Sequence, residues 1–183
     1  RSDYDKILRQ RNTLLKRASR TLRQGYGGSN DSDSALDTLD TWDSHLAAAG
    51  AQVMAQRIVL AHVLSPHVKN AYQRLAPESR PAQITYRSTV DKALVEAGIT
   101  PETVANDVAG ATPVIEAVLL SELARQRDTD IQRGTSTCGP HRDDVELLLG
   151  TQPARGYASH GESWSFALAL RLASFEWQRE QGT

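Results

Sequence analysis

Two long helical patterns of opposite charge, separated by a short segment rich in glycine and serine, occupy the first 75 residues of the chain. Residues 1–24 hold eight basic residues against two aspartates, whereas residues 25–50 hold five aspartates and no lysine or arginine. Apolar side chains recur at helical spacing in the first pattern, at Tyr4, Ile7, Leu8, Leu14, Leu15, Ala18 and Leu22. The two patterns predict a pair of antiparallel amphipathic helices, which we call the arm.

The connection between these helices has the sequence GYGGSNDSDS at residues 25–34, which is typical of a mobile connector and not of a helix or strand. Ser34, with Asp37 three residues later, predicts the start of the second helix. Its apolar residues keep a seven-residue spacing, at Leu39, Leu46 and Val53. Pro66 predicts a kink, after which the helix continues to Leu75.

The rest of the chain predicts shorter helices mixed with strands. Strands are expected at residues 83–89, 135–138 and 145–149, with Gly150 to Gly156 as a turn and Tyr157-Ala158 closing a hairpin. Helices are expected at residues 91–97 and after Thr100-Pro101 and Thr112-Pro113, because each of these pairs combines a cap with a proline. The last helix is apolar enough to be buried on most sides. The fold class is therefore expected to be α+β and mostly helical.

Composition excludes several classes of protein. The net charge of −1 provides no global basic field for nucleic acid or membrane. A single cysteine, Cys138, excludes an internal disulfide framework and favours the cytoplasm. No uninterrupted apolar run reaches 18 residues and no signal peptide is visible, so no membrane partner is expected. The chain opens with Arg1, and we expect it to be a piece of a longer protein.

Residues 139–144, with the sequence GPHRDD, place an imidazole, a guanidinium and two carboxylates in one turn. Cys138 and His141 could form half of a metal site, but no second pair at ligand spacing exists, so no metal site is expected. Two interpretations remain open. Either the aspartates cap backbone groups in a turn between strands, or His141, Arg142 and Asp143 form an ion-paired site next to a phosphate.

Residues 158–163, with the sequence ASHGES, lead directly into the last apolar helix. A hydroxyl and a glycine at a helix start favour anion binding, because free N–H groups and the helix dipole attract phosphate. The alternative is a simple capping box, with Ser159 as the N-cap and Glu162 at the third helical position. A Ser-His nucleophile is disfavoured, because the segment is not a strand–GxSxG–helix elbow.

The chain lacks the two motifs that hold nucleotide phosphates and magnesium. No G-x-x-x-x-G-K-[ST] sequence occurs, and no apolar strand ends in Asp-Asp or Asp-Glu. We therefore assign no catalytic residue within this chain.

Three segments together resemble the RecF family, bacterial recombination-mediator ATPases with an ABC/SMC-like head. They are YDKILRQRNTLLK from Tyr4, RGTSTCGPHRDDVELLLG from Arg133 and YASHGESWSFALALRLA from Tyr157, in the family's order and at about its spacing. The resemblance implies that residues 1–127 are the helical arm, with a small strand insert near 83–89. It also implies that residues 128–183 are part of the ATPase head.

The resemblance assigns Ser159, His160, Gly161 and Glu162 to the ABC signature, which contacts the γ-phosphate of ATP held by the opposite subunit. His160 and Glu162 depart from the Gly and Gln of ABC transporters, and an anionic Glu162 disfavours direct phosphate contact. The Walker A and Walker B motifs would lie outside these residues. ATP and Mg²⁺ are therefore expected to bind the full-length protein and not this chain alone.

For the whole protein, the resemblance implies a weak, DNA-stimulated ATPase of DNA repair, DNA replication and the SOS response. It would dimerise on ATP, bind DNA near single-strand/double-strand junctions and help RecO and RecR load recombinase. Arg9, Lys16, Arg20 and Arg23 share one broad helical face and are the candidate DNA-phosphate contacts. The alternative is that the basic residues of this helix pair with Asp33, Asp37, Asp40 and Asp43 and hold the arm together.

Two other functions stay open at this point. One is a non-enzymatic helical interaction module, in which the SHGES segment is only a helix cap. The other is a different SMC-like head, such as a DNA-end-processing ATPase or a condensin-type protein. The short arm, which ends by Leu75, argues against a condensin-type protein.

Overall fold

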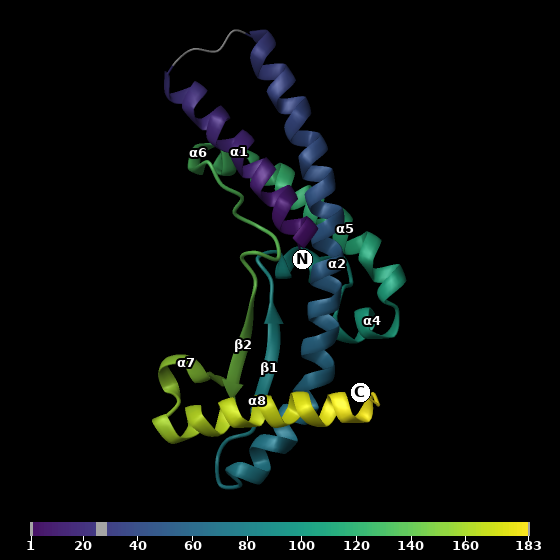
Figure 1. Ribbon diagram of the computed structural model, residues 1–183, viewed down its shortest axis with the longest axis vertical. Coiled ribbons are helices and arrows are strands. Elements are labelled where there is room, and N and C mark those ends of the chain that lie inside the picture. Colours follow the sequence, from purple (N-terminus) through teal and green to yellow (C-terminus); the bar gives the residue numbers. More distant parts are fainter. Residues whose placement is uncertain (1, 25–28, 183) are drawn as a thin grey trace. The chain divides into compact units, whose positions relative to one another are not determined.

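The computed structural model describes residues 2–24 and 29–182, without the side chains of Ser2, residues 21–24 and residues 29–37. The described elements confirm the mostly helical α+β class (Figure 1). In chain order they are α1 (Ser2–Gln24), α2 (Ser29–Leu75), β1 (Ala82–Arg87), α3 (Asp91–Glu96), α4 (Pro101–Asn106), α5 (Val108–Arg125), α6 (Arg127–Arg133), β2 (Asp144–Leu149), β3 (Gln152–Pro153), α7 (Ala154–Tyr157) and α8 (His160–Glu180).

The chain forms two compact units, each built from two separate stretches of sequence. Unit 1 comprises residues 1–56 and 88–143, and unit 2 comprises residues 57–87 and 144–183. Helix α2 contributes its first part to unit 1 and its last part to unit 2. The expected division between arm and head after residue 127 follows sequence order instead, and it stays a prediction.

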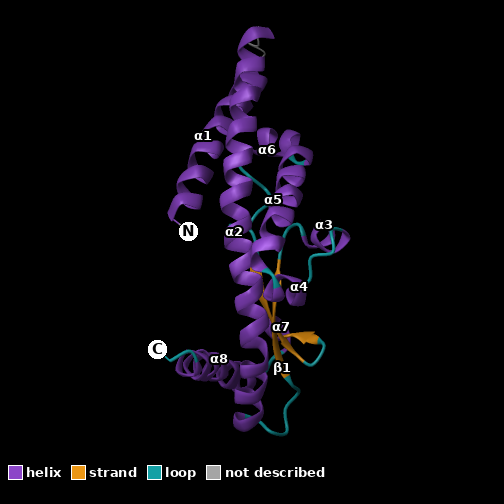
Figure 2. Ribbon diagram, turned by 90° about the vertical axis from the view of Figure 1, so that its right-hand side faces the viewer, coloured by secondary structure: helices purple, strands orange, loops and turns teal. Residues whose placement is uncertain are grey.

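In unit 1, α1 runs antiparallel to the first part of α2, as the sequence predicts (Figures 1 and 2). Tyr4 lies beside Gly50, Arg11 contacts Asp43, and Leu15 packs with Leu39 and Ile131 of α6. Partner numbers on α2 therefore fall as those on α1 rise. This register buries the stripe of α1 that contains Tyr4, Arg11 and Leu15.

Helix α5 packs against this pair at a glycine. Its buried stripe consists of Ala111, Ile115, Leu119 and Leu123, spaced four residues apart. A Cβ at Gly50 would lie 2.7 Å from Leu119 Cδ2 and 3.3 Å from Tyr4 Cε2. A side chain at this position would require Leu119 to move, so glycine favours the close approach of α1, α2 and α5.

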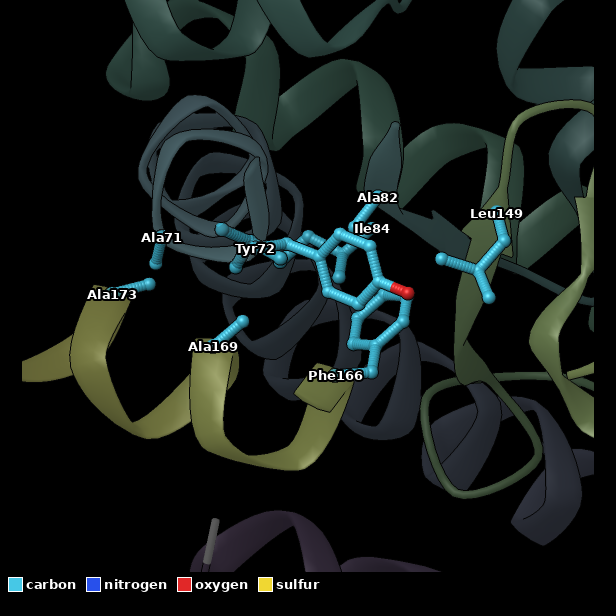
Figure 3. Close-up of a cluster of buried hydrophobic side chains, with 9 residues drawn as sticks. Ala71, Tyr72, Ala82, Ile84, Leu149, Phe166, Ala169 and Ala173 are labelled. Carbon is cyan, nitrogen blue, oxygen red and sulfur yellow. The ribbon is translucent and has the colours of Figure 1, made fainter. Parts of the chain in front are cut away.

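Unit 2 packs a small antiparallel sheet against the last part of α2 and against α8. Strand β1 pairs with β2 from Ala82↔Leu149 to Arg87↔Asp144, and β2 pairs with the short β3. Figure 2 shows these strands in orange. Figure 3 shows the core that joins the three layers, formed by Val68, Ala71, Tyr72, Ala82, Ile84, Leu149, Phe166, Ala169 and Ala173.

Two expected helix starts are wrong. Helix α2 begins at Ser29 and not near Ser34, so only residues 25–28 of the expected connector lie outside the described residues. Small polar residues are well accommodated in a first helical turn, where N–H groups are unpaired. Helix α5 begins at Val108 and not at Thr112-Pro113, because Asp107 Oδ1 accepts the Gly110 N–H at 2.8 Å and caps the helix.

The expectations for residues 135–138 and 157–158 are also wrong. Residues 135–138 form no strand, because their polar groups bind side chains of α1 and α6: Ser136 N–H donates to Asn12 and Thr137 N–H donates to Asp130. Residues 152–153 pair with β2 in place of Tyr157-Ala158, since the turn is limited to Gly150-Thr151. The strands expected at 83–89 and 145–149, and the helices at 91–97 and after Thr100, are confirmed within one or two residues.

Helix α2 contains a segment, Thr38–Leu75, that is long and apolar enough to cross a membrane by length and composition alone. The sequence expectation of no such segment was based on uninterrupted apolar runs, which the polar residues of this helix break. Leu46, Ala47, Ala51 and Met54 are fully or almost fully buried in unit 1, as are Val68, Ala71 and Tyr72 in unit 2. This burial is typical of a core helix.

Candidate functional site

The SHGES segment begins α8, and the core of unit 2 holds it in place. Phe166, two turns into the helix, packs on Tyr72 of α2 with ring centroids 5.6 Å apart (Figure 3). Ala169 and Ala173 continue the buried stripe, which is narrow because α2 and the sheet cover one face only. The expectation that α8 is buried on most sides is wrong, since Trp164 is 68% exposed and Phe175 is 60% exposed.

Ser159 and Glu162 form a complete capping box. The Ser159 hydroxyl accepts the Glu162 N–H at 3.2 Å, and Glu162 Oε2 accepts the Ser159 N–H at 2.8 Å. This is the geometry that the capping interpretation predicts. It fixes the direction of the first turn but does not by itself exclude a ligand, because a capping box satisfies only two of the first N–H groups.

The Glu162 carboxylate has two further contacts, both with the loop that follows α2. Ser79 Oγ donates to Glu162 Oε1 at 3.2 Å, and Arg80 Nη2 approaches the same oxygen at 3.3 Å. The Ser159 N–H, together with the Ser159 hydroxyl and Arg80, lowers the pKa of Glu162 to about 2. Glu162 is therefore ionised at neutral pH, and its charge is turned toward Ser159 and Arg80.

The opposite side of the first turn is open. A Cβ at Gly161 would meet nothing within 4 Å. No acceptor among the described residues takes the N–H of His160 or Gly161. His160 Nε2 accepts the indole N–H of Trp164 at 2.8 Å, which holds both rings on the exposed surface of the helix. These features leave two N–H donors at the positive end of a 21-residue helix accessible to an anion.

Residues 139–143 of the GPHRDD turn lie in unit 1, and Asp144 begins β2 of unit 2. His141, Arg142 and Asp143 each bind neighbouring protein groups. Since the Ser136 carbonyl only accepts, His141 Nε2 carries the hydrogen toward it at 3.2 Å, and the Tyr4 hydroxyl donates to Nδ1 at 2.7 Å. Burial lowers the pKa of His141 from its ordinary 6.5, so the ring is neutral at pH 7. Arg142 also donates to the Ser136 carbonyl.

Asp143 acts as a turn acceptor. Its carboxylate accepts hydrogen bonds from Ser88 Oγ at 3.0 Å and from the Thr89 N–H at 2.8 Å. These contacts agree with the interpretation in which aspartates cap backbone groups. The role of His141, Arg142 and Asp143 next to a phosphate stays a prediction. Within the described residues, no three His, Cys, Asp or Glu side chains cluster as metal ligands.

Arg9, Lys16 and Arg20 are exposed on one side of α1, and none of them forms an ion pair with a described residue. The side chains of Arg23, Asp33 and Asp37 lie outside the described residues. Asp40 and Asp43 bind Arg127, and Asp43 also binds Arg11. Arg11, another basic residue of α1, is fully buried and does not belong to this exposed basic surface.

Two contacts near the candidate sites have no signal in the sequence. Ser79 and Arg80 contact Glu162, yet more than 80 residues of sequence separate them from it. The β1–β2 pairing and the packing of α8 on α2 bring them together. Arg133 ends α6 next to Gly134, and a Cβ added at Gly134 would lie 3.3 Å from Lys16 Cγ. The exposed charge of Arg133 therefore extends the basic face of α1. No local pattern in the sequence indicates either proximity.

Comparison with curated proteins gives whole-chain matches. The chain is 49% identical over 197 aligned residues to "DNA replication and repair protein RecF" of Corynebacterium jeikeium (strain K411), covering 100% of this chain and 46% of that protein. It is 50% identical over 185 aligned residues to the protein of that name from Rhodococcus erythropolis (strain PR4 / NBRC 100887), covering 100% of this chain and 44% of that protein. The chain is homologous to part of RecF. No family model matches it.

Solved RecF structures share the fold. A structure of the recombination mediator protein RecF with ATP in the RecFOR pathway superposes with a TM-score of 0.75 at 23% identity, covering 98% of this chain and 41% of that one. A second RecF structure, described as RecF-ATPrS, gives a TM-score of 0.74 at 23% identity, with the same coverage. The chain thus spans less than half the length of the RecF proteins it matches.

The residues present fit part of an ATP site. The N–H groups of His160 and Gly161 and the open space at Gly161 suit the oxygens of a phosphate, whereas the described residues offer no carboxylate cluster for Mg²⁺. Such a site would contact the nucleotide from one side and would need the phosphate-holding and metal-holding groups from elsewhere.

Proposed function

We propose that this chain is the arm and signature-bearing part of a RecF-type recombination mediator that acts in DNA replication, DNA repair and the SOS response in the cytoplasm. The observation that carries the proposal is the homology to RecF along the whole chain, at about half of all positions. The mediator binds gapped DNA near single-strand/double-strand junctions and works with RecO and RecR to load recombinase.

The start of α8 contacts ATP that the partner subunit of an ATP-dependent homodimer holds. The N–H groups of His160 and Gly161 bind the γ-phosphate, helped by the positive end of the helix dipole and by the Ser159 hydroxyl. Gly161 gives the phosphate room to approach. Mg²⁺ and the catalytic base come from the rest of the head, which makes the whole protein a weak, DNA-stimulated ATPase whose hydrolysis resets the dimer.

The exposed basic face of α1 contacts DNA phosphates. Arg9, Lys16 and Arg20 are exposed without ion-pair partners among the described residues, and Arg23 falls on the same side by helical spacing. Contacts of this type attract DNA of any sequence. They would therefore contribute affinity, and recognition of the junction would come from elsewhere on the dimer.

The test of the trans contact uses two variants of the full-length protein. A Cβ at position 161 would meet nothing within 4 Å, so Gly161→Gln adds a side chain to this open space, and replacing a glycine in a helix favours the fold. Ser159→Arg introduces a bulky side chain at the N-cap and costs about 1 kcal/mol of helix stability. Gln178→Arg, at the exposed far end of α8, is the control for the added charge.

Both site variants should remain monomeric in sedimentation with ATP, while binding ATP as monomers with nearly unchanged affinity. The control should dimerise normally. An ATP-dependent dimer of Gly161→Gln would contradict the trans contact. It would favour the non-enzymatic helical module, in which the capping box is the whole role of these residues.

A further inference from the structure

Glu162 creates an electrostatic problem for the proposed site. It is ionised in the first turn of α8, one residue from Gly161, where the phosphate approaches. A free carboxylate at this position would repel the phosphate, because like charges a few ångströms apart interact strongly near a protein surface. A phosphate site that contains this glutamate therefore needs neighbouring groups that turn the carboxylate away from the phosphate and neutralise its charge.

The contacts of Glu162 have this effect. Oε2 accepts the Ser159 N–H at 2.8 Å, and Oε1 faces both Ser79 Oγ at 3.2 Å and Arg80 Nη2 at 3.3 Å. The Ser79 hydroxyl is itself 3.0 Å from the Tyr72 hydroxyl. Because Ser79 donates its single hydrogen to the carboxylate, Tyr72 donates to Ser79. A chain of hydrogen bonds therefore connects α2 with the first turn of α8.

The loop that carries Arg80 is fixed by the sheet. The Gly150 N–H donates to the Pro81 carbonyl at 2.8 Å, next to the β1–β2 pair. The stem of Arg80 lies against Gly150, where an added Cβ would be 3.6 Å from Arg80 Cβ and Cδ. Gly150 also has a φ of +60°, which favours glycine. The guanidinium is thus held beside Glu162 by contacts that do not involve the proposed ligand.

We propose that Ser79 and Arg80 are positioning residues for ATP bridging: they hold Glu162 against Ser159, away from the open side of the turn, and neutralise its charge. The inference rests on the proposed trans contact at Ser159 to Glu162. It explains how a glutamate functions where a neutral residue would be expected in a phosphate-binding turn. It also assigns a role to the end of α2, since Tyr72 orients the Ser79 hydroxyl.

The test compares four forms of the full-length protein: the parent, Arg80→Gln, Glu162→Gln and the double variant. Arg80→Gln leaves the capping box and Glu162 in place but removes the neutralising charge. It should raise the ATP concentration for half-maximal dimerisation by about tenfold. This effect should shrink at high salt, because Arg80 and Glu162 are partly exposed. Arg80→Lys should restore most of the affinity.

The double variant separates positioning from a merely structural role. Glutamine at position 162 keeps the capping box and removes the charge, so Arg80 becomes dispensable and Arg80→Gln/Glu162→Gln should dimerise about as readily as Glu162→Gln alone. Arg179→Gln, at the far end of α8, controls for loss of a positive charge. An unchanged Arg80→Gln protein, or a double variant as weak as Arg80→Gln, would overturn the inference.

Failure of this inference can be distinguished from failure of the proposed function. If the trans contact is wrong, Gly161→Gln dimerises normally, whatever the Arg80 variants do. If only the positioning role is wrong, Gly161→Gln stays monomeric while the Arg80 and Glu162 variants do not compensate for each other.

Discussion

Arg11 shows how a single charged residue can belong to the core. Its Nε donates to Asp43 Oδ1 at 2.5 Å, and its Nη1 donates to Asp130 Oδ2 at 2.7 Å and to Ser136 Oγ at 2.8 Å. Arg127 also pairs with Asp43, and with the more exposed Asp40. The cluster tolerates burial because each charge has an ion-pair partner, although Arg11 Nη2 and Arg127 Nε are buried without a hydrogen-bond partner among the described residues.

We expect Arg11→Met to destabilise the protein by about 3–5 kcal/mol, because the substitution leaves Asp43 and Asp130 buried with less compensation. Urea unfolding measures this loss. Arg9→Met, on the exposed side of the same helix, is the matched control and should change stability by less than about 0.5 kcal/mol. Equal stability of the Arg11→Met variant and the parent protein would contradict a stabilising effect of the buried cluster.

The lowered pKa of His141 predicts that the stability of the protein depends on pH. Burial lowers its pKa in the folded protein below the ordinary 6.5, so the unfolded chain binds a proton more readily. The contribution of the neutral His141 ring to the free energy of unfolding is therefore complete above pH 6.5 and is lost as the pH falls below that value. Melting temperatures between about pH 8 and pH 5 should fall more for the parent than for His141→Gln. Parallel curves for the two proteins would contradict the prediction.

At the scale of the element, periodicity predicted much of the fold but not the partners of each helix. The stripe from Tyr4 to Leu15 identified the buried face of α1, because apolar spacing follows the helical repeat whatever covers it. The buried position of Arg11 in the same stripe was not predicted, because its charge is balanced by Asp43 and Asp130, which lie far away in sequence. The contacts of Glu162 with Ser79 and Arg80 were hidden for the same reason, whereas its capping box is local and was predictable.

The basic face of α1 gives a prediction for DNA binding. Lys16→Gln with Arg20→Gln should weaken binding for every sequence and reduce the slope of log K against log salt by about 0.9 for each lost duplex contact. Lys69→Gln with Lys92→Gln removes two exposed charges elsewhere and is the control. An unchanged slope with reduced thermal stability would favour the alternative, in which these charges hold the arm together.

At the scale of the whole molecule, the prediction concerns the chain by itself. We expect the 183 residues alone to show no ATPase activity and only weak ATP affinity, because no Walker A sequence occurs in them. Isothermal titration with Mg-ATP and a phosphate-release assay measure both properties. Saturable, tight ATP binding would contradict the assignment of a purely trans-acting site.

The chain leaves the sheet at the end of β1 and returns to it at the start of β2, which has a consequence for how such proteins can change during evolution. The ladder extends to the pair Arg87↔Asp144, and immediately beyond it Ser88 and Thr89 bind Asp143. Residues 88–143 thus leave the strand pair after Arg87 and return to it at Asp144, and they form unit 1 together with residues 1–56. Changes of length in the loops of residues 88–143 can therefore alter this part of unit 1 while preserving the β1–β2 pairing that supports Arg80 and the start of α8.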